Sequence, residues 1–303
     1  MLPTQNGAMR LFRAGGITVF LHYSWFIVAV IEVQIRSKTY GSLAWNAAEY
    51  LALFAIVLMH EFGHSLACRQ TGGQADKIIL WPFGGIAFVN PPQRPGAVLW
   101  SIAAGPLVNV VLVGVFKLAF IACQSLDLVS TAPDAYLFLK IIATINLYLL
   151  IFNMLPIYPL DGGQILRAIL WFVFGRARSL TIAAVIGAIG GAVLIVLAAL
   201  TQNWWLLVLM LFVLSQCWAG FKHARALGVI AKIPRRDGFA CPSCGAPPVL
   251  GPAWVCPNCK QEFDTFESGA FCPKCEAQFP GTTCFDCRES HPIAEWKTGA
   301  RKN

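Results

Sequence analysis

Long apolar runs separated by short polar connections fill the chain up to about residue 230. A helix needs about 20 mostly apolar residues to cross the hydrocarbon core of a bilayer. Six runs approach that length, so we expect six transmembrane helices, over residues 17–35, 43–68, 97–122, 136–155, 180–200 and 206–221. The sequence therefore predicts an α-helical polytopic membrane protein.

One stretch between these runs has a different pattern. Residues 76–90 read DKIILWPFGGIAFVN, which is too short to span a bilayer and is rich in β-branched and aromatic residues. Pro82 and the pair Gly84 and Gly85 interrupt it, as is typical of a turn between two strands. We expect a short β-hairpin associated with the membrane; a simple hairpin in the interface is the plainest interpretation.

The composition agrees with a membrane protein, because 57% of the residues are hydrophobic and only 13% are charged. The net charge is +8, which could suggest a nucleic-acid partner. However, residues 1–230 hold 14 Lys and Arg against 7 Asp and Glu, whereas residues 231–303 hold 9 against 8. The excess therefore lies among the membrane spans, where basic loops report orientation. We expect no nucleic-acid partner.

The basic residues predict which side of the membrane the termini face. Six spans place both termini on one side, and with the N-terminus inside, the outer loops hold only Arg36 and Lys38. The inner loops then hold Arg69, Lys77, Arg94, Arg167, Arg176, Arg178, Lys222 and Arg225. By the positive-inside rule we expect a multi-pass protein with cytoplasmic N- and C-termini.

A metal-binding pattern follows directly on an uncharged stretch, residues 51–59. His60, Glu61 and His64 form H-E-x-x-H, in which two imidazoles one helical turn apart can share a zinc ion. The glutamate beside them can act as a general base. Ionisable side chains within a membrane helix are costly and mark functional sites. The alternative is a pair of core histidines with a buried glutamate.

A catalytic zinc usually has three protein ligands, and Asp161 is the best candidate for the third. It follows the apolar run that ends near Leu155, in a loop that contains Pro156 and Pro159. Irregular backbone at membrane depth is tolerated where it is buried in protein or lines a wet cavity. The alternative is that Asp161 caps the helix that follows it.

At these residues the chain resembles the site-2 proteases, a family of intramembrane zinc metalloproteases. Residues 60–64, HEFGH, match the first zinc motif of that family. Residues 153–163 resemble its second motif, in which N-x-x-P leads into L-D-G, and residues 104–109 resemble its G-P-x-x-N stretch. The resemblance extends over about residues 16–178.

The resemblance implies a role for each of these residues. His60, His64 and Asp161 are expected to bind the catalytic zinc, and Glu61 is expected to be the catalytic base. In this family, the second-motif asparagine contacts the substrate backbone and the hairpin edge can pair with an unwound substrate. We therefore expect four substrate-binding residues, Asn153, Gly84, Gly85 and Asn109.

The chain changes character after residue 230, where eight of its eleven cysteines form four C-x-x-C pairs. These are Cys241 and Cys244, Cys256 and Cys259, Cys272 and Cys275, and Cys284 and Cys287. Two such pairs complete a closed four-thiolate zinc site, which leaves no open catalytic position. The tail resembles a double zinc ribbon with two structural zinc ions. Each C-x-x-C pair forms one zinc knuckle, and the sequence leaves open which knuckles share an ion.

The domain organisation follows from these features. We expect an intramembrane metalloprotease domain over residues 1–230 and a linker over 231–238. A double zinc-ribbon domain over 239–290 and a tail over 291–303 complete the chain. The expected cofactors are thus one catalytic and two structural zinc ions.

The expected activity is that of a zinc metalloendopeptidase that cleaves membrane proteins in or near their transmembrane segments, as in regulated intramembrane proteolysis. Its expected partners are a transmembrane protein substrate, the lipid bilayer and a cytoplasmic protein bound by the ribbons. One alternative is a membrane-embedded zinc transporter, although the sequence has no second H-E-x-x-H copy of the kind that internal repeats would give. The other is a non-catalytic anchor for the ribbons, which would not need Glu61.

Overall fold

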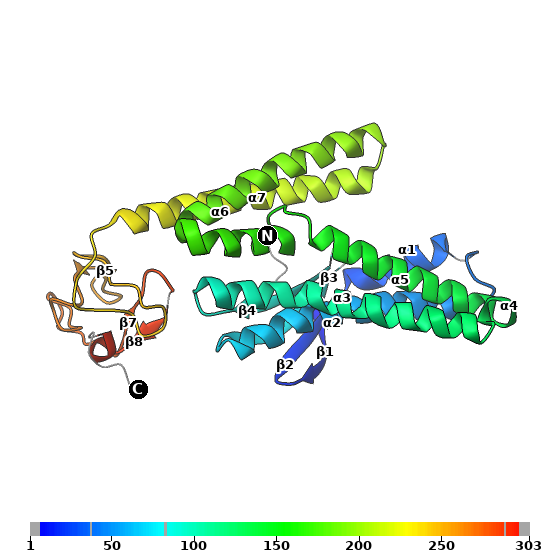
Figure 1. Ribbon diagram of the computed structural model, residues 1–303. Coiled ribbons are helices and arrows are strands. Elements are labelled where there is room, and N and C mark those ends of the chain that lie inside the picture. Colours follow the sequence, from blue (N-terminus) through cyan, green and yellow to red (C-terminus); the bar gives the residue numbers. More distant parts are fainter. Residues whose placement is uncertain (1–6, 37, 82–83, 288, 297–303) are drawn as a thin grey trace.

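Long apolar helices dominate the computed structural model, which describes residues 7–36, 38–81, 84–287 and 289–296. In these residues, five helices are long and apolar enough to cross a membrane. They are α2 (Leu43–Gln70), α3 (Pro95–Ser125), α5 (Pro133–Asn153), α6 (Asp161–Leu200) and α7 (Trp204–Lys232). Figure 1 shows α2, α3 and α5 side by side, with α6 and α7 forming a separate hairpin above them. A four-residue helix, α4 (Leu128–Thr131), lies between α3 and α5.

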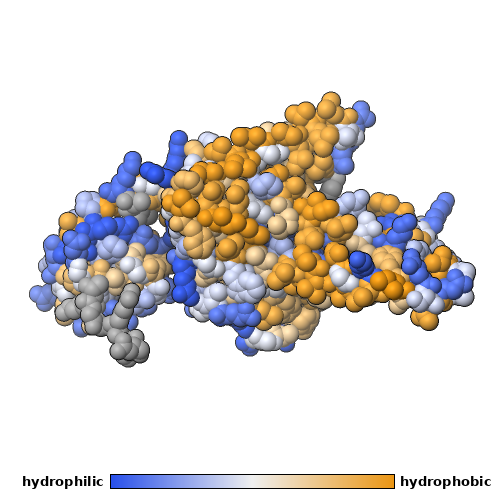
Figure 2. All heavy atoms as spheres, in the orientation of Figure 1, coloured by the Kyte–Doolittle hydropathy of each residue, from blue (hydrophilic) through white to orange (hydrophobic). Residues whose placement is uncertain are grey.

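Apolar side chains cover much of the helical part, whereas the C-terminal module, which comprises the described residues after Lys232, is mostly polar (Figure 2). Large side chains such as Leu118, Phe172 and Val173 are exposed on these helices. Apolar patches of this extent are typical of a surface that faces lipid. The fold is therefore that of an integral membrane protein.

The first predicted span has a different structure. Residues 17–35 form strand β2 (Ile17–His22) and helix α1 (Ser24–Ile35). A helix of 12 residues is about 18 Å long, well short of the ~30 Å hydrocarbon core. Ile17, Val19 and Leu21 are buried on one face of β2, alternating with less buried residues, and this period of two belongs to a strand. A single helix over residues 17–35 was thus a wrong prediction.

The predicted hairpin is half of a larger sheet. Strands β1 (Ala8–Ala14), β2, β3 (Gln74–Trp81) and β4 (Gly84–Asn90) form one sheet in the order β1-β2-β3-β4. Strands β2 and β3 are parallel, with Val19 opposite Ile78, and α1 and α2 make the crossover that a parallel pair requires. The buried face of the sheet packs on α2, which places β4, an edge strand, beside the metal motif.

Glycines let the helices approach closely around the site. A Cβ on Gly63 of α2 would lie 2.7 Å from the carbonyl oxygen of Ala104 in α3, so only glycine fits there. Helix α6 has a sharp elbow at Gly175, where φ is 75° and ψ is 171°. Its first part packs on α3 through Ile165 and Ala168, and its second part packs on α7.

The C-terminal module consists of short strand pairs. Strands β5 (Trp254–Val255) and β6 (Glu262–Phe263) form one hairpin, and β7 (Thr282–Thr283) and β8 (Ser290–His291) form another. A 3₁₀ helix, η1 (Ile293–Trp296), closes the described part of the module. Each hairpin is too small to bury a core of its own.

Two predicted domain boundaries differ from the structure. Within the expected linker, Arg236 N–H donates to Pro248 O at 2.9 Å and Leu250 N–H donates to Pro234 O at 2.8 Å. Within the expected tail, the Trp296 side chain is fully buried and stacks edge-on against Phe266. Residues on both sides of the predicted ribbon domain therefore belong to the module, because so small a core needs them.

Candidate active site and metal centres

Helix α2 presents both histidines of the H-E-x-x-H motif to one cavity. The His60 and His64 side chains are buried, and their Nε2 atoms lie 3.1 Å apart. Each ring is held from behind by α3: Nδ1 of His64 lies 2.9 Å from Ser101 O, and Nδ1 of His60 lies 2.6 Å from Asn109 Oδ1. Both Nε2 atoms consequently point to the same spot.

Asp161 joins the two histidines from α6. Its Oδ2 atom lies 3.1 Å from Nε2 of His60 and 3.5 Å from Nε2 of His64. Asp161 is the first residue of α6, and the residue at the N-cap is Leu160, whose side chain makes no capping bond. The cap interpretation therefore does not describe the position of Asp161.

The preceding loop is tight enough to require two glycines. A Cβ on Gly162 would lie 2.3 Å from Met154 O, and one on Gly163 would lie 2.4 Å from Tyr158 N. The L-D-G-G sequence thus allows α6 to start against the end of α5, which brings Asp161 to the histidines.

The three converging atoms fit a zinc ion. A backbone carbonyl can only accept, so Nδ1 of His64 carries the proton and its Nε2 has a free lone pair. Nδ1 of His60 faces Oδ1 of Asn109, an amide oxygen, so with the amide in this orientation Nδ1 donates as well. The Nε2 lone pairs of the two histidines and a carboxylate oxygen of Asp161 then face one another. Three electron-rich atoms at such short distances are stabilised by a cation between them. Ligands of a tetrahedral zinc with N and O bonds lie about 3.3 Å apart, close to the distances between these three atoms.

Gly105 of α3 provides the space beside these ligands. A Cβ there would lie 2.3 Å from Nε2 of His64 and 2.9 Å from Nε2 of His60. Any side chain at this position would enter the volume that the ligands and an ion need.

Strand β4 holds Glu61. The backbone N–H of Ala87 donates to Glu61 Oε2 at 2.8 Å. A Cβ on Gly85 would lie 2.6 Å from Glu61 Oε1, so the second hairpin glycine makes room for the carboxylate. Glu61 is thus fixed by the edge strand, next to the histidines that flank it in sequence.

The side chains of His60, Glu61, His64 and Asp161 line one cavity of about 420 Å³. Its other walls are largely apolar and include Trp81, Phe152 and Phe212. The cavity also contains every residue that the sequence predicted to bind substrate: Asn153, Gly84, Gly85 and Asn109. Asn109 differs from the others because it is fully buried and contacts His60. Its side-chain amide therefore holds a metal-binding histidine in place.

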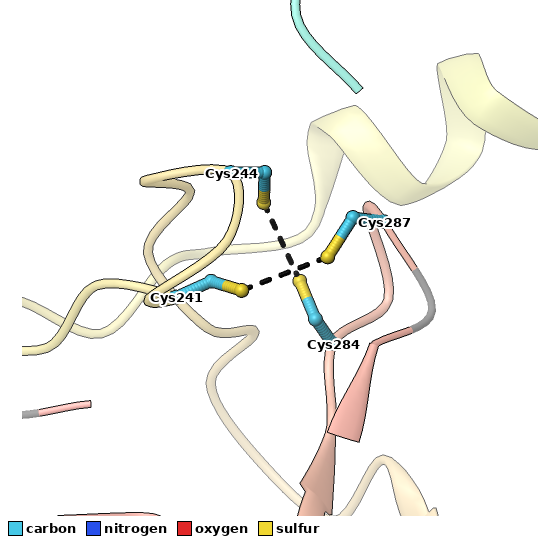
Figure 3. A group of neighbouring side chains, drawn as sticks. All are labelled: Cys241, Cys244, Cys284 and Cys287. Atoms are coloured by element: carbon cyan, nitrogen blue, oxygen red, sulfur yellow. Dashed lines mark hydrogen bonds between the residues drawn. The ribbon is translucent and has the colours of Figure 1, made fainter. Parts of the chain in front are cut away.

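The cysteine pairs form two clusters in a nested arrangement. Figure 3 shows the first and fourth knuckles facing each other, with Sγ distances of 3.6 Å from Cys241 to Cys287 and 3.8 Å from Cys244 to Cys284. In the second and third knuckles, Cys256 lies 3.6 Å from Cys275 and Cys259 lies 3.5 Å from Cys272. Thiolates around a tetrahedral zinc are about 3.8 Å apart, so both clusters suit that ion.

Two groups in the active-site region were not predicted from the sequence. They are Ser101, whose backbone oxygen holds His64, and Asn146 of α5, whose amide contacts Asn109. A backbone contact leaves no signal in a sequence. Asn146 did leave one, because it is an amide in the middle of an apolar run.

Comparisons with known proteins agree with the geometry. The model of peptidase family M50 matches residues 48–135 and 127–197, which contain both metal motifs. A zinc metalloprotease of Methanocaldococcus jannaschii is 35% identical over 210 residues, 69% of this chain and 59% of the relative. Stage IV sporulation protein FB of Bacillus subtilis is 31% identical over 130 residues, 42% of this chain and 41% of that protein.

A solved structure is similar as well. The site-2 protease from Methanocaldococcus jannaschii superposes with a TM-score of 0.52 at 29% identity, covering 71% of this chain and 95% of that one. The chain spans 59% of the length of its archaeal curated relative. The residues that match the family model carry the H-E-x-x-H motif on α2 and the L-D-G motif at the start of α6. The chain therefore belongs to peptidase family M50, as its resemblance to the site-2 proteases indicated.

Proposed function

We propose that this chain is an intramembrane zinc metalloprotease that hydrolyses peptide bonds in or near the transmembrane segments of membrane proteins. The observation that carries the proposal is the convergence of His60, His64 and Asp161 beside Glu61, in a cavity between membrane-spanning helices. The family membership and the names of the relatives support it.

The chain's own residues define the chemistry. Two imidazoles and a carboxylate would hold the zinc, which when bound acidifies water and polarises a carbonyl group. Glu61 takes a proton from the attacking water and delivers it to the amide nitrogen as the C–N bond breaks. The Ala87 N–H holds Glu61 Oε2, so the carboxylate is already oriented for this transfer.

The substrate must expose its backbone in the cavity. A helix hides its carbonyl groups in hydrogen bonds, so a transmembrane substrate must unwind before cleavage. The apolar walls of the cavity, such as Phe152 and Phe212, suit its side chains. Strand β4 is an edge strand in the sheet that the structure describes, so an extended substrate segment would pair with it beside Gly84 and Gly85. A Cβ on Gly84 would have nothing within 4 Å, which leaves room for that segment. The Asn153 amide lines the same space and would bind the substrate backbone.

The C-terminal module would hold two structural zinc ions as a double zinc ribbon, which gives three zinc ions per chain. Each of its clusters contributes four thiols, so neither has an open position. The module is joined to the elbow of α6, because the Arg176 guanidinium donates to the backbone oxygen of Asp286. Its position suits recruitment of a cytoplasmic protein partner.

Both termini would be cytoplasmic even though the described residues hold five candidate spans and not six. Strand β2 pairs with β3, which follows the end of α2, so the N-terminal strands lie at that same end of the molecule. The end of the molecule where α2 stops and α3 starts carries Arg69 and Arg94, and the elbow of α6 carries Arg176. The opposite end, between α1 and α2, carries Arg36 and Lys38. This asymmetry supports a cytoplasmic active-site end.

The experiment that tests the function separates metal binding from turnover. Full-length protein in detergent is assayed on a purified transmembrane substrate, and zinc content is measured in parallel. Glu61→Gln is expected to keep the membrane-site zinc and to lose cleavage. If Glu61→Gln cleaves at the rate of the parent protein, Glu61 is not the base and the proposed mechanism is wrong.

A further inference from the structure

Behind His60 lies a pair of asparagines that the proposed mechanism does not use. Asn109 of α3 and Asn146 of α5 are both fully buried within membrane-spanning helices. Nδ2 of Asn109 lies 2.8 Å from Oδ1 of Asn146, and Nδ2 of Asn146 lies 3.0 Å from the backbone oxygen of Asn109. Buried polar groups at membrane depth mark function, and this pair ends on a metal ligand.

The orientation of both amides follows from a single group, the backbone carbonyl of Asn109. A carbonyl can only accept a hydrogen bond, so the Asn146 atom beside it must be Nδ2. The other amide atom of Asn146 is then Oδ1, which can only accept and requires Nδ2 from Asn109. That leaves Asn109 Oδ1 facing His60.

This orientation decides which ring nitrogen of His60 carries the proton. Asn109 Oδ1 lies 2.6 Å from Nδ1 of His60, so Nδ1 must donate. Nε2 then keeps its lone pair, directed at Asp161 Oδ2. If the Asn109 amide turned over, its Nδ2 would face Nδ1, and the favoured tautomer of His60 would carry its proton on Nε2. That tautomer could not bind a metal.

The tautomer of His64 does not depend on an oriented amide. His64 donates to the backbone oxygen of Ser101, which cannot be exchanged for a donor. An amide side chain can turn over and therefore needs a partner that fixes it. The two ligands thus differ in how their tautomers are set, and only that of His60 depends on a third helix.

We propose that Asn146 is a positioning residue that fixes the metal-binding tautomer of His60 by orienting the amide of Asn109. This inference rests on the proposed metal site, but not on proteolysis. Groups that orient a ligating histidine typically change metal affinity 10- to 100-fold when they are removed.

The test measures zinc binding in full-length protein that carries Glu61→Gln, so that turnover plays no part. Zinc retained against a graded chelator is recorded, and His60→Ala identifies the fraction that belongs to the membrane site. Asn146→Leu, which keeps the shape but removes both hydrogen bonds, is expected to weaken that fraction 10- to 100-fold. Excess zinc should restore full occupancy. Ile142→Ala, a change at a buried apolar position one turn earlier on α5, is the control and should leave zinc affinity unchanged. Asn146→Ala replaces Asn146→Leu if the latter does not fold.

A double-mutant cycle shows whether Asn146 acts through Asn109. In protein that already carries Asn109→Ala, Asn146→Leu should have no further effect on zinc affinity. The proposal is overturned if Asn146→Leu leaves the affinity unchanged, if Ile142→Ala weakens it equally, or if the loss persists without the Asn109 amide. If the predicted cycle is found but the parent protein with Glu61 intact cleaves no transmembrane substrate, the protease function is refuted and this inference stands.

Discussion

Nε2 of His60 lies 3.1 Å from Oδ2 of Asp161, although α2 and α6 bring these residues together from distant parts of the chain. The contact depends on Gly162 and Gly163, which allow α6 to start against the end of α5. The site is therefore assembled from the C-terminal half of one helix and the first residue of another.

Replacing Asp161 tests its role as the third ligand. Asp161→Ala removes an oxygen from the three converging atoms, so it should abolish cleavage and weaken the membrane-site zinc. Asp161→Asn keeps one oxygen acceptor and should retain part of the metal. Zinc content and cleavage of a transmembrane substrate are the measurements. Normal cleavage by Asp161→Ala would show that the third ligand lies elsewhere.

A methyl group at Gly105 tests the packing of α3 on the ligands. Gly105→Ala would place Cβ 2.3 Å from Nε2 of His64, so the rings must move and the membrane-site zinc should be lost together with activity. Gly114→Ala on the same helix is the control, because its Cβ would have nothing within 4 Å. Equal zinc binding by both variants would show that the absence of a side chain at Gly105 is not needed for the metal site.

Gly85 should give a different pattern from Gly105. A Cβ at Gly85 would displace Glu61, whose Oε1 would lie 2.6 Å away, while the metal ligands keep their positions. We expect Gly85→Ala to retain its membrane-site zinc and to lose ~100-fold or more in turnover, since a general base typically contributes at least that much. Gly96→Ala serves as the comparison, since its nearest neighbour would be Phe172 at 3.9 Å. Loss of zinc from Gly85→Ala would mean that β4 supports the ligands as well.

The nested cysteine clusters predict how zinc is lost in double variants. Cys241→Ser with Cys284→Ser damages a single cluster and should remove one zinc ion per chain, whereas Cys241→Ser with Cys272→Ser damages both and should remove two. Elemental analysis of purified protein measures this, with Cys123→Ser as the control. Loss of two zinc ions in both double variants would indicate that neighbouring knuckles pair instead, and the reverse of the expected result would indicate that the first knuckle pairs with the third.

Local patterns in the sequence were sufficient to predict the metal motif and the long helices, because one helical turn separates His60 from His64. They were insufficient where both faces of a segment are apolar. Residues 17–21 lack an obvious alternation, so a strand was read as part of a helix. Contacts between distant segments also could not be predicted from local patterns. These contacts include the pairing of the knuckles, the burial of Trp296 and the partner of Asn146.

The most direct measurement is the mass of the fragments released from a purified single-span substrate in liposomes that contain the full-length protein. The account predicts two fragments whose new ends lie in or near the membrane-spanning segment. They should be absent with Glu61→Gln or after chelation, and zinc should restore them after chelation. Cleavage only in the distant soluble part of the substrate, or cleavage that persists with Glu61→Gln, would contradict an intramembrane metalloprotease.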